Sequence, residues 1–70
     1  MQTLTVTPTD IRVGDILCGD DGVPFAKAAT VKTRRARGRV SVRVTTTGLD
    51  GTGEGMPVSF PAGSNAIVQR

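Results

Sequence analysis

Residues 29–46 contain the pattern that most restricts the fold, because valine and polar side chains alternate there on both sides of a short turn. In the second arm Val40, Val42 and Val44 recur with a period of two, which in a β-strand directs them to one face and their polar neighbours to the other. The arms are separated by Ala36-Arg37-Gly38, and a three-residue loop that ends in glycine suits a type I turn followed by a left-handed residue. The stretch predicts a long β-hairpin.

The rest of the chain reads as short strands divided by Gly, Pro, Asp and Asn, and no segment keeps helical periodicity over two turns. The stretches with the composition of strands are 4–7, 16–18, 56–60 and 66–70, with an irregular or edge segment at 23–25. A chain of 70 residues makes one domain and is too short for two full sheets, so we expect a single all-β domain over residues 1–70. This domain is predicted to be a small, strongly bent barrel of five or six strands with a long central β-hairpin. The predicted core consists of Leu4, Val6, Ile16, Phe25, Val31, Val40, Val42, Val44, Val58, Phe60 and Ile67.

The residue types that usually perform catalysis or hold metals are scarce. The chain has one cysteine and no histidine, so it can form neither an intrachain disulfide nor an ordinary structural zinc site, and it lacks the commonest general base. Cys18 lies in an apolar stretch, where we expect a buried and unreactive thiol. Asp15, Asp20 and Asp21 lack the spacing of a calcium loop, so we expect them to form turns. We therefore expect no enzyme activity, no metal and no cofactor.

Cysteine usage and hydropathy indicate in which cellular compartment the protein is expected. A single cysteine fits a reducing environment. The first residues lack the basic and long apolar regions of a signal peptide, and no stretch approaches the roughly 18 consecutive apolar residues that span a bilayer. We expect a cytoplasmic protein without membrane association.

Positive charge is concentrated in the same stretch as the predicted hairpin. The net charge is +3, but residues 27–43 contain seven of the nine cations and no acid, so this window carries +7 and the remainder −4. Such a polarised distribution attracts anions more strongly than the net charge implies. A solvated face that keeps a small domain soluble is the alternative explanation. The candidate binding residues are the cations of the hairpin: Lys32, Arg34, Arg35, Arg37, Arg39 and Arg43.

The alternation also predicts how these cations are arranged. Lys32, Arg34 and Arg43 share the outward face if the valines point inward, and the three arginines of residues 35–39 cluster at the tip. Arginine forks onto phosphate, and a β-ribbon can enter or flank a groove of nucleic acid. Asn and Gln, which read base edges, are absent from the window, and no aromatic residue is interleaved for base stacking. We therefore expect salt-sensitive binding to the phosphate backbone without sequence specificity.

Three segments resemble a known family. The run Asp10-Ile11-Arg12-Val13-Gly14-Asp15-Ile16-Leu17, the basic hairpin, and Val58-Ser59-Phe60-Pro61-Ala62 are similar to segments of small SH3-like β-barrel proteins of actinobacteria and their phages. The resemblance implies an SH3-like barrel that binds nucleic acid or another protein, and it transfers no catalytic residues. It also implies an actinobacterial or phage source, with the host cytoplasm as the place of action of a phage protein.

Two functions stay open at this point. The leading one is a non-enzymatic binding module that applies its cationic β-hairpin to nucleic acid phosphates. The alternative is a protein-interaction or assembly module. Such a module would dock an acidic host or phage protein through the same arginines, or self-associate through strand edges into a homo-oligomer.

Overall fold

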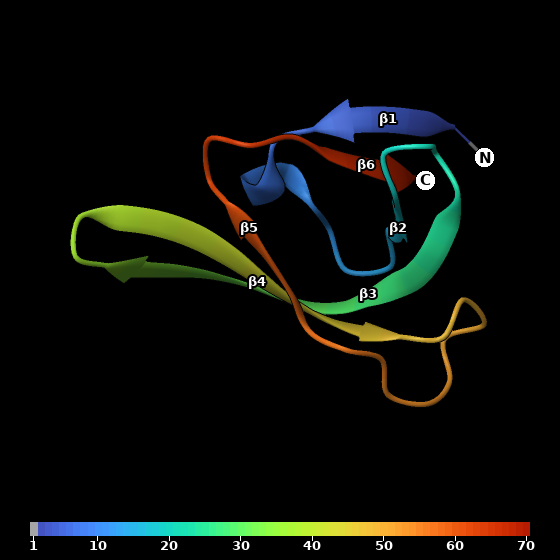
Figure 1. The fold of residues 1–70 in the computed structure, drawn as a ribbon. Coiled ribbons are helices and arrows are strands. Elements are labelled where there is room, and N and C mark those ends of the chain that lie inside the picture. Colours follow the sequence, from blue (N-terminus) through green and yellow to red (C-terminus); the bar gives the residue numbers. More distant parts are fainter. Residues whose placement is uncertain (1) are drawn as a thin grey trace.

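The computed structural model describes residues 2–70, which form one antiparallel sheet of six strands and a short 3₁₀ turn. The elements are β1 (Thr3–Val6), η1 (Pro8–Asp10), β2 (Ile16–Cys18), β3 (Pro24–Ala36), β4 (Arg39–Thr47), β5 (Val58–Pro61) and β6 (Ala66–Gln69). Neighbouring strands follow the order β1-β6-β2-β3-β4-β5 (Figure 1). The predicted all-β class, with six strands, is confirmed.

The short connection between β5 and β6 requires the sheet to curl. These strands are four spacings apart in the sheet order, which amounts to about 19 Å in a flat sheet. Only residues 62–65 join Pro61 to Ala66, and a chain of that length spans at most about 18 Å. The sheet therefore bends over its own core (Figure 1). Within residues 2–70, β1 and β5 do not pair with each other, so the predicted barrel is not closed.

The inner face of the bent sheet carries the core. Val42 and Val44, both predicted core residues, are completely buried, and burial of one such side chain stabilises the fold by about 1.5–3 kcal/mol. Val40 and Val58, also predicted, are only half-buried. The buried cluster consists of Ile11, Leu17, Ala28, Val42, Val44, Ala66 and Val68, with Leu4, Val6, Val31 and Phe60 packed against it.

Phe25 was predicted to fill the core, and this prediction is wrong. Its side chain is 51% exposed, because the buried positions of β3 are Ala26 and Ala28, on the opposite face of the strand. Ala28 packs in the same buried cluster as Leu17 and Val44. The inner face of β3 therefore carries two small residues, and the large Phe25 lies on the outer face.

The core positions predicted in β2 and β6 are displaced by one residue. Leu17 and Val68 are buried, whereas Ile16 and Ile67 are only half-buried. Both strands are short runs of consecutive apolar residues, and such runs contain no polar alternation that marks the inward face. The existence of these strands is confirmed, and the face that each presents to the core is not as predicted.

A two-residue turn joins β3 to β4, in place of the predicted three-residue loop. Ala36 pairs with Arg39, which leaves only Arg37 and Gly38 between the strands. Their φ angles are 53° and 73°, and positive φ at both central residues is what a type I′ turn requires. The twist of that turn matches the right-handed twist of the two strands, which explains why the tighter connection forms.

The predicted turn at Asp15 fastens the end of the chain to the sheet. Asp15 is buried, and its Oδ2 accepts the backbone N–H of Arg12 at 2.9 Å. Arg70 donates to both carboxylate oxygens of Asp15, from Nε at 2.9 Å and from Nη2 at 3.1 Å, and to the carbonyl of Asp10 at 2.7 Å. These bonds to Asp15 raise the pKa of Arg70 despite some loss of hydration. Asp15 therefore has a structural role.

Candidate nucleic-acid interface

The far half of the β3–β4 hairpin extends past the neighbouring strands on both sides. β2 pairs with β3 no further than Lys27, and β5 pairs with β4 only over Ser41–Val44. Every residue from 32 to 39 is exposed, and Figure 1 shows this end of the hairpin standing away from the other strands. We call residues 32–43 the cationic ribbon, because they contain all six predicted binding residues.

Four of the six cations lie on the outer face of the ribbon, away from the core. Lys32 is directly opposite Arg43, and cross-strand neighbours point the same way. Arg34 and Arg39 pair with small residues on that same face. The predicted sharing of the outward face by Lys32, Arg34 and Arg43 is confirmed, and Arg39 joins them.

A shallow groove of about 530 Å³ runs over this outer face. It is lined by Thr30, Lys32, Arg34, Arg43 and Thr45 together with Thr33, which pairs with Val42 and belongs to the opposite face. The hydroxyls of Thr30 and Thr45 hydrogen-bond to each other across the two strands. These threonines were not among the predicted site residues. Their signal in the sequence is that they fall in the same alternation as the outward cations, two residues from Lys32 and from Arg43.

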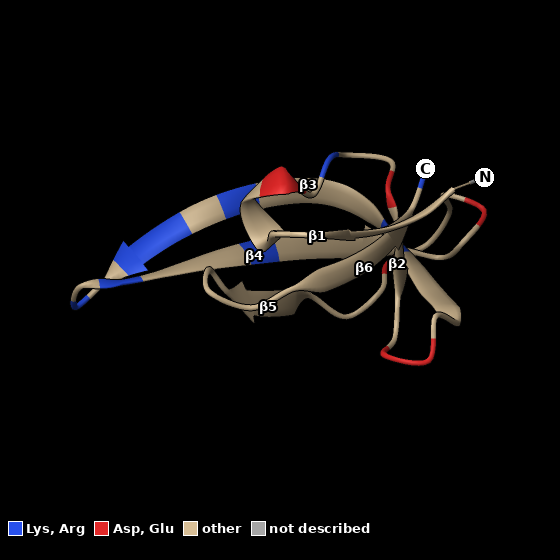
Figure 2. Cartoon of the chain, turned by 90° about the horizontal axis from the view of Figure 1, so that it is seen from above, with Lys and Arg blue, Asp and Glu red and all other residues tan. Residues whose placement is uncertain are grey.

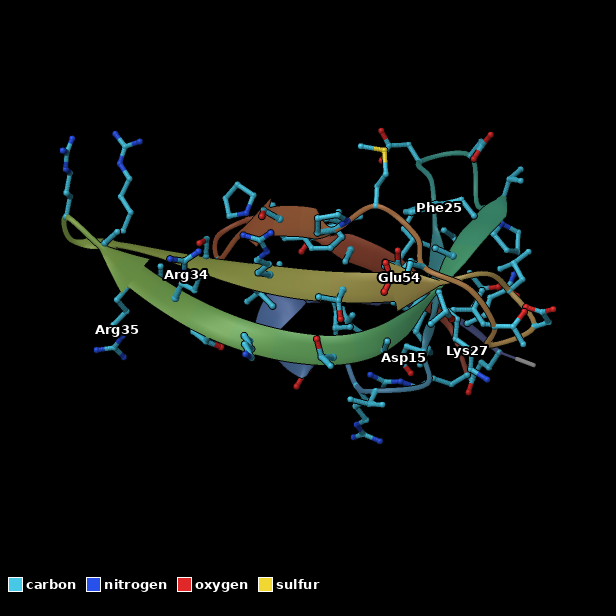
Figure 3. All side chains as sticks on the ribbon, turned by 90° about the horizontal axis from the view of Figure 1, so that it is seen from below. Asp15, Phe25, Lys27, Arg34, Arg35 and Glu54 are labelled. Atoms are coloured by element: carbon cyan, nitrogen blue, oxygen red, sulfur yellow. The ribbon has the colours of Figure 1, made fainter. Side chains whose placement is uncertain are left out.

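Arg35 lies on the inner face of the ribbon. The register places it opposite Val40, and Figure 3 shows Arg34 and Arg35 projecting to opposite sides of the strand. Arg37 occupies the turn, and Arg39 belongs to the outer face. The three arginines predicted to cluster at the tip therefore lie at the same end of the hairpin but do not share a face.

The cations of the ribbon have no acidic partners among residues 2–70. Within residues 2–70, the pair of Arg70 with Asp15 is the only ion pair closer than 4.0 Å. All six cations of the ribbon are exposed, and Figure 2 shows the acidic residues on η1 and on the loops outside the ribbon. The ribbon is therefore a surface of charge +6 that no side chain of the described residues neutralises.

Lys27 belongs to the other end of the molecule. It pairs with Ile16 on one side and Thr47 on the other, and lies next to the loop that carries Asp50. Hydrogen bonds from the backbone and hydroxyl of Thr52 hold the pKa of Asp50 below its ordinary value, and Lys27 lowers it further. The seven cations of the predicted window thus divide into six on the ribbon and one beside an acidic loop.

We compared the chain with protein-family models, curated proteins and solved structures. None of them matches. The function of the ribbon therefore has to be inferred from its own geometry and charge.

Other kinds of site find little support among the described residues. No three or more His, Cys, Asp or Glu side chains of residues 2–70 come together in a way that could hold a metal ion. Cys18 is buried as predicted, and its Sγ lies 3.8 Å from the carbonyl oxygen of Ile16. Burial raises the pKa of the Cys18 thiol, and the charge of Asp21 raises it further. The part of the chain that the structure describes contains no helix with the length and hydropathy to span a bilayer.

Proposed function

We propose that the chain is a non-enzymatic binding module, built on an SH3-like scaffold, that places the cationic ribbon against nucleic acid phosphates. One observation carries this proposal. Six exposed cations, none of them paired with an acid of the described chain, lie on a ribbon that extends past the strands around the core. Arginine, which makes up five of the six, matches the geometry of phosphate oxygens through its planar fork of donors.

The outer face is long enough to contact several phosphates of a nucleic acid. From Lys32 to the position opposite Arg39 is four residues along β3, or about 13 Å. One strand of a nucleic acid rises about 3.4 Å per nucleotide, so this row matches the rise of about four nucleotides. The hydroxyls of Thr30 and Thr45 lie in the same groove, and threonine is a common donor to phosphate oxygens.

The pairing of Lys32 with Arg43 also favours an anionic ligand. Like charges directly opposite each other in a sheet are destabilising, and Lys32 and Arg43 form such a pair. A phosphate bound between the two side chains replaces this repulsion by two attractions. The free protein therefore carries a local electrostatic cost that binding of an anion removes.

Binding of this kind has a characteristic salt dependence. If the four cations of the outer face each neutralise one phosphate of a duplex, log K falls against log salt with a slope of about −3.6. Affinity then decreases about 150-fold between 50 and 200 mM salt. Ligands held mainly by apolar contacts do not show such a dependence.

The experiment is fluorescence anisotropy with labelled duplex DNA, single-stranded DNA and RNA over this salt range. The test variant is Arg34→Ala/Arg39→Ala, and the matched control is Arg12→Ala/Lys27→Ala, because each takes the net charge from +3 to +1. We expect the test variant to reduce the magnitude of the slope by about two units and the control to leave it unchanged. Equal losses in both variants, or no binding by the wild type at 50 mM salt, would refute the proposal.

The free edge of β3 favours a second candidate, a module that associates through strand edges. Beyond Ala28 this strand has β4 on one side and no strand of residues 2–70 on the other. Its unpaired backbone groups over residues 30–36 are a template for an added strand, from an acidic peptide or a second copy. Self-association predicts a mass above 7.3 kDa in size-exclusion chromatography with light scattering. A monomer at every concentration would exclude the second copy.

A further inference from the structure

The cationic ribbon carries positive charge on both of its faces. Arg34 and Arg35 are adjacent in β3 and project in opposite directions, Arg34 with the outer row and Arg35 beside Val40 on the inner face (Figure 3). A ligand with phosphates on two sides of the ribbon satisfies both. We infer that the ligand is the major groove of B-form DNA, which the ribbon enters with one face toward each phosphate backbone. This inference rests on the proposed function and names its ligand class.

The thickness of the ribbon fits that groove. Packed sheets lie about 10 Å apart, so the side chains of one face extend about 5 Å, and arginine extends further. With Arg34 on one face and Arg35 on the other, the ribbon measures at least about 10 Å across. The major groove of B-DNA is about 12 Å wide and the minor groove about 6 Å. In A-form RNA the major groove is deep and narrow, so the width selects DNA.

The ribbon also projects far enough to reach into the groove. Pairing with β5 ends at Ser41, and β2 ends well before this level on the other side. Just past β5 the N–H of Ala62 also donates to the carbonyl of Val40 at 3.0 Å, so the free ribbon runs from Val40 to Gly38, which is two residues or about 7 Å. The major groove is about 8.5 Å deep, so the free ribbon extends through most of that depth before the segment that follows β5 meets the DNA backbone.

A single strand does not use this arrangement. It has one phosphate backbone, which contacts one face of the ribbon, and its bases are usually held by stacking on aromatic side chains. Phe25 is the exposed aromatic residue of the described chain, and it lines a pocket with Glu54 at the opposite end of β3. Stacking on Phe25 would therefore bring phosphates toward an acidic loop and away from Arg35.

The test compares Arg34→Gln, Arg35→Gln and the double variant, with Lys27→Gln as the control outside the ribbon. The probes are a short labelled DNA duplex, its separated strands, and the RNA duplex of the same sequence. For the DNA duplex we expect each single variant to reduce the magnitude of the salt slope by about 0.9, the double variant by about 1.8, and the control not at all. Thermal unfolding followed by circular dichroism establishes that the variants are folded, as expected for the exposed Arg34 and Arg35 and the half-buried Lys27.

The outcomes distinguish the inference from the proposed function. If Arg35→Gln leaves the slope unchanged while Arg34→Gln reduces it, the ligand lies on one face and only the inference is wrong. Equal or tighter binding of the single strands or of the RNA duplex overturns the inference in the same way. If the wild type binds none of the three probes at low salt, or if the control Lys27→Gln reduces the slope equally, the proposed function fails as well.

Discussion

The turn of the hairpin contains a conformational cost that a single substitution removes. Arg37 is the one residue of 2–70 other than glycine with a positive φ, at 53°. For a residue with an ordinary side chain, the left-handed region costs about 1–2 kcal/mol. Asparagine tolerates this region, and Asn-Gly is the favoured pair for a type I′ turn. Since Gly38 is already present, Arg37→Asn creates that pair. We expect it to stabilise the fold by about 1 kcal/mol.

The expected stabilisation is large enough to measure in a chain of this size. For a domain of 60–100 residues, 1 kcal/mol shifts the unfolding midpoint by about 4–8 °C. The chain contains no Trp and no Tyr, so unfolding is followed by far-UV circular dichroism and not by intrinsic fluorescence. If Arg37 contacts a phosphate, the same substitution also reduces the magnitude of the salt slope of DNA binding by about 0.9. We therefore expect Arg37→Asn to be more stable and to bind more weakly.

The control for this prediction is Arg39→Asn. It removes the same charge two residues away, at the start of β4, where φ is not positive and asparagine is unfavourable. We expect Arg39→Asn to leave the midpoint unchanged or to lower it. A midpoint for Arg37→Asn that does not rise would refute the conformational argument. An equal rise in both variants would attribute the gain to reduced charge repulsion and not to the backbone.

Three further predictions concern the body of the protein. Asp15→Ala removes the acceptor of Arg12 N–H and of the Arg70 guanidinium, so urea unfolding should show a loss of about 2–3 kcal/mol. Val44→Ala removes two methyl groups from a fully buried site and should cost about 2 kcal/mol in the same assay, while Kd for the folded protein stays unchanged. Because the pKa of Cys18 is raised in the folded state above its ordinary 9.0, the fold should lose stability as pH rises past about 9. Cys18→Ala should lessen that loss, and identical pH profiles for the two proteins would contradict the assignment.

The sequence predicts most of what depends on a clear alternation. Val42 and Val44 alternate with polar residues, so the inward face of β4 and the outward face of Arg43 follow from the period of two. All of β2 and the first three residues of β6 are apolar, so no local alternation shows that Leu17, and not Ile16, points to the core. Which side chain points inward in these two strands depends on how the sheet bends over the core. That bend follows from the order of the strands in the sheet.

The error on Phe25 has the same origin. A large aromatic residue in a chain with few of them is a reasonable candidate for the core. Its neighbours Ala26 and Ala28 are small, and only the packing of β3 against Leu17 and Val44 makes small residues the better occupants of the inner face. Residue size alone therefore does not predict which face of a strand is buried.

The arrangement of the cations at the tip of the hairpin depends on whether the turn contains two residues or three. Because the turn contains two residues and not three, Ala36 pairs with Arg39, and Arg35 is placed opposite Val40. In a hairpin the turn fixes the register, and the register fixes which side chains share a face. The identity of the six candidate residues and the outward face of Lys32, Arg34 and Arg43 are predictable from the sequence, but the positions of Arg35, Arg37 and Arg39 around the tip follow from the pairing.

The separation of core and ribbon also explains how such a dense positive charge is tolerated. The inner face of β4 contributes Val42 and Val44 to the core, whereas the outer positions of the ribbon lie on the opposite face of the strands. Two features of the ribbon nevertheless lower the stability of the free protein: the left-handed Arg37 and the like-charged pair Lys32–Arg43. If these cations are retained for binding, replacing them should raise stability and weaken DNA binding together. A ribbon that only solubilises the domain gains nothing from Arg37 in particular, since any polar residue at that position would serve equally well.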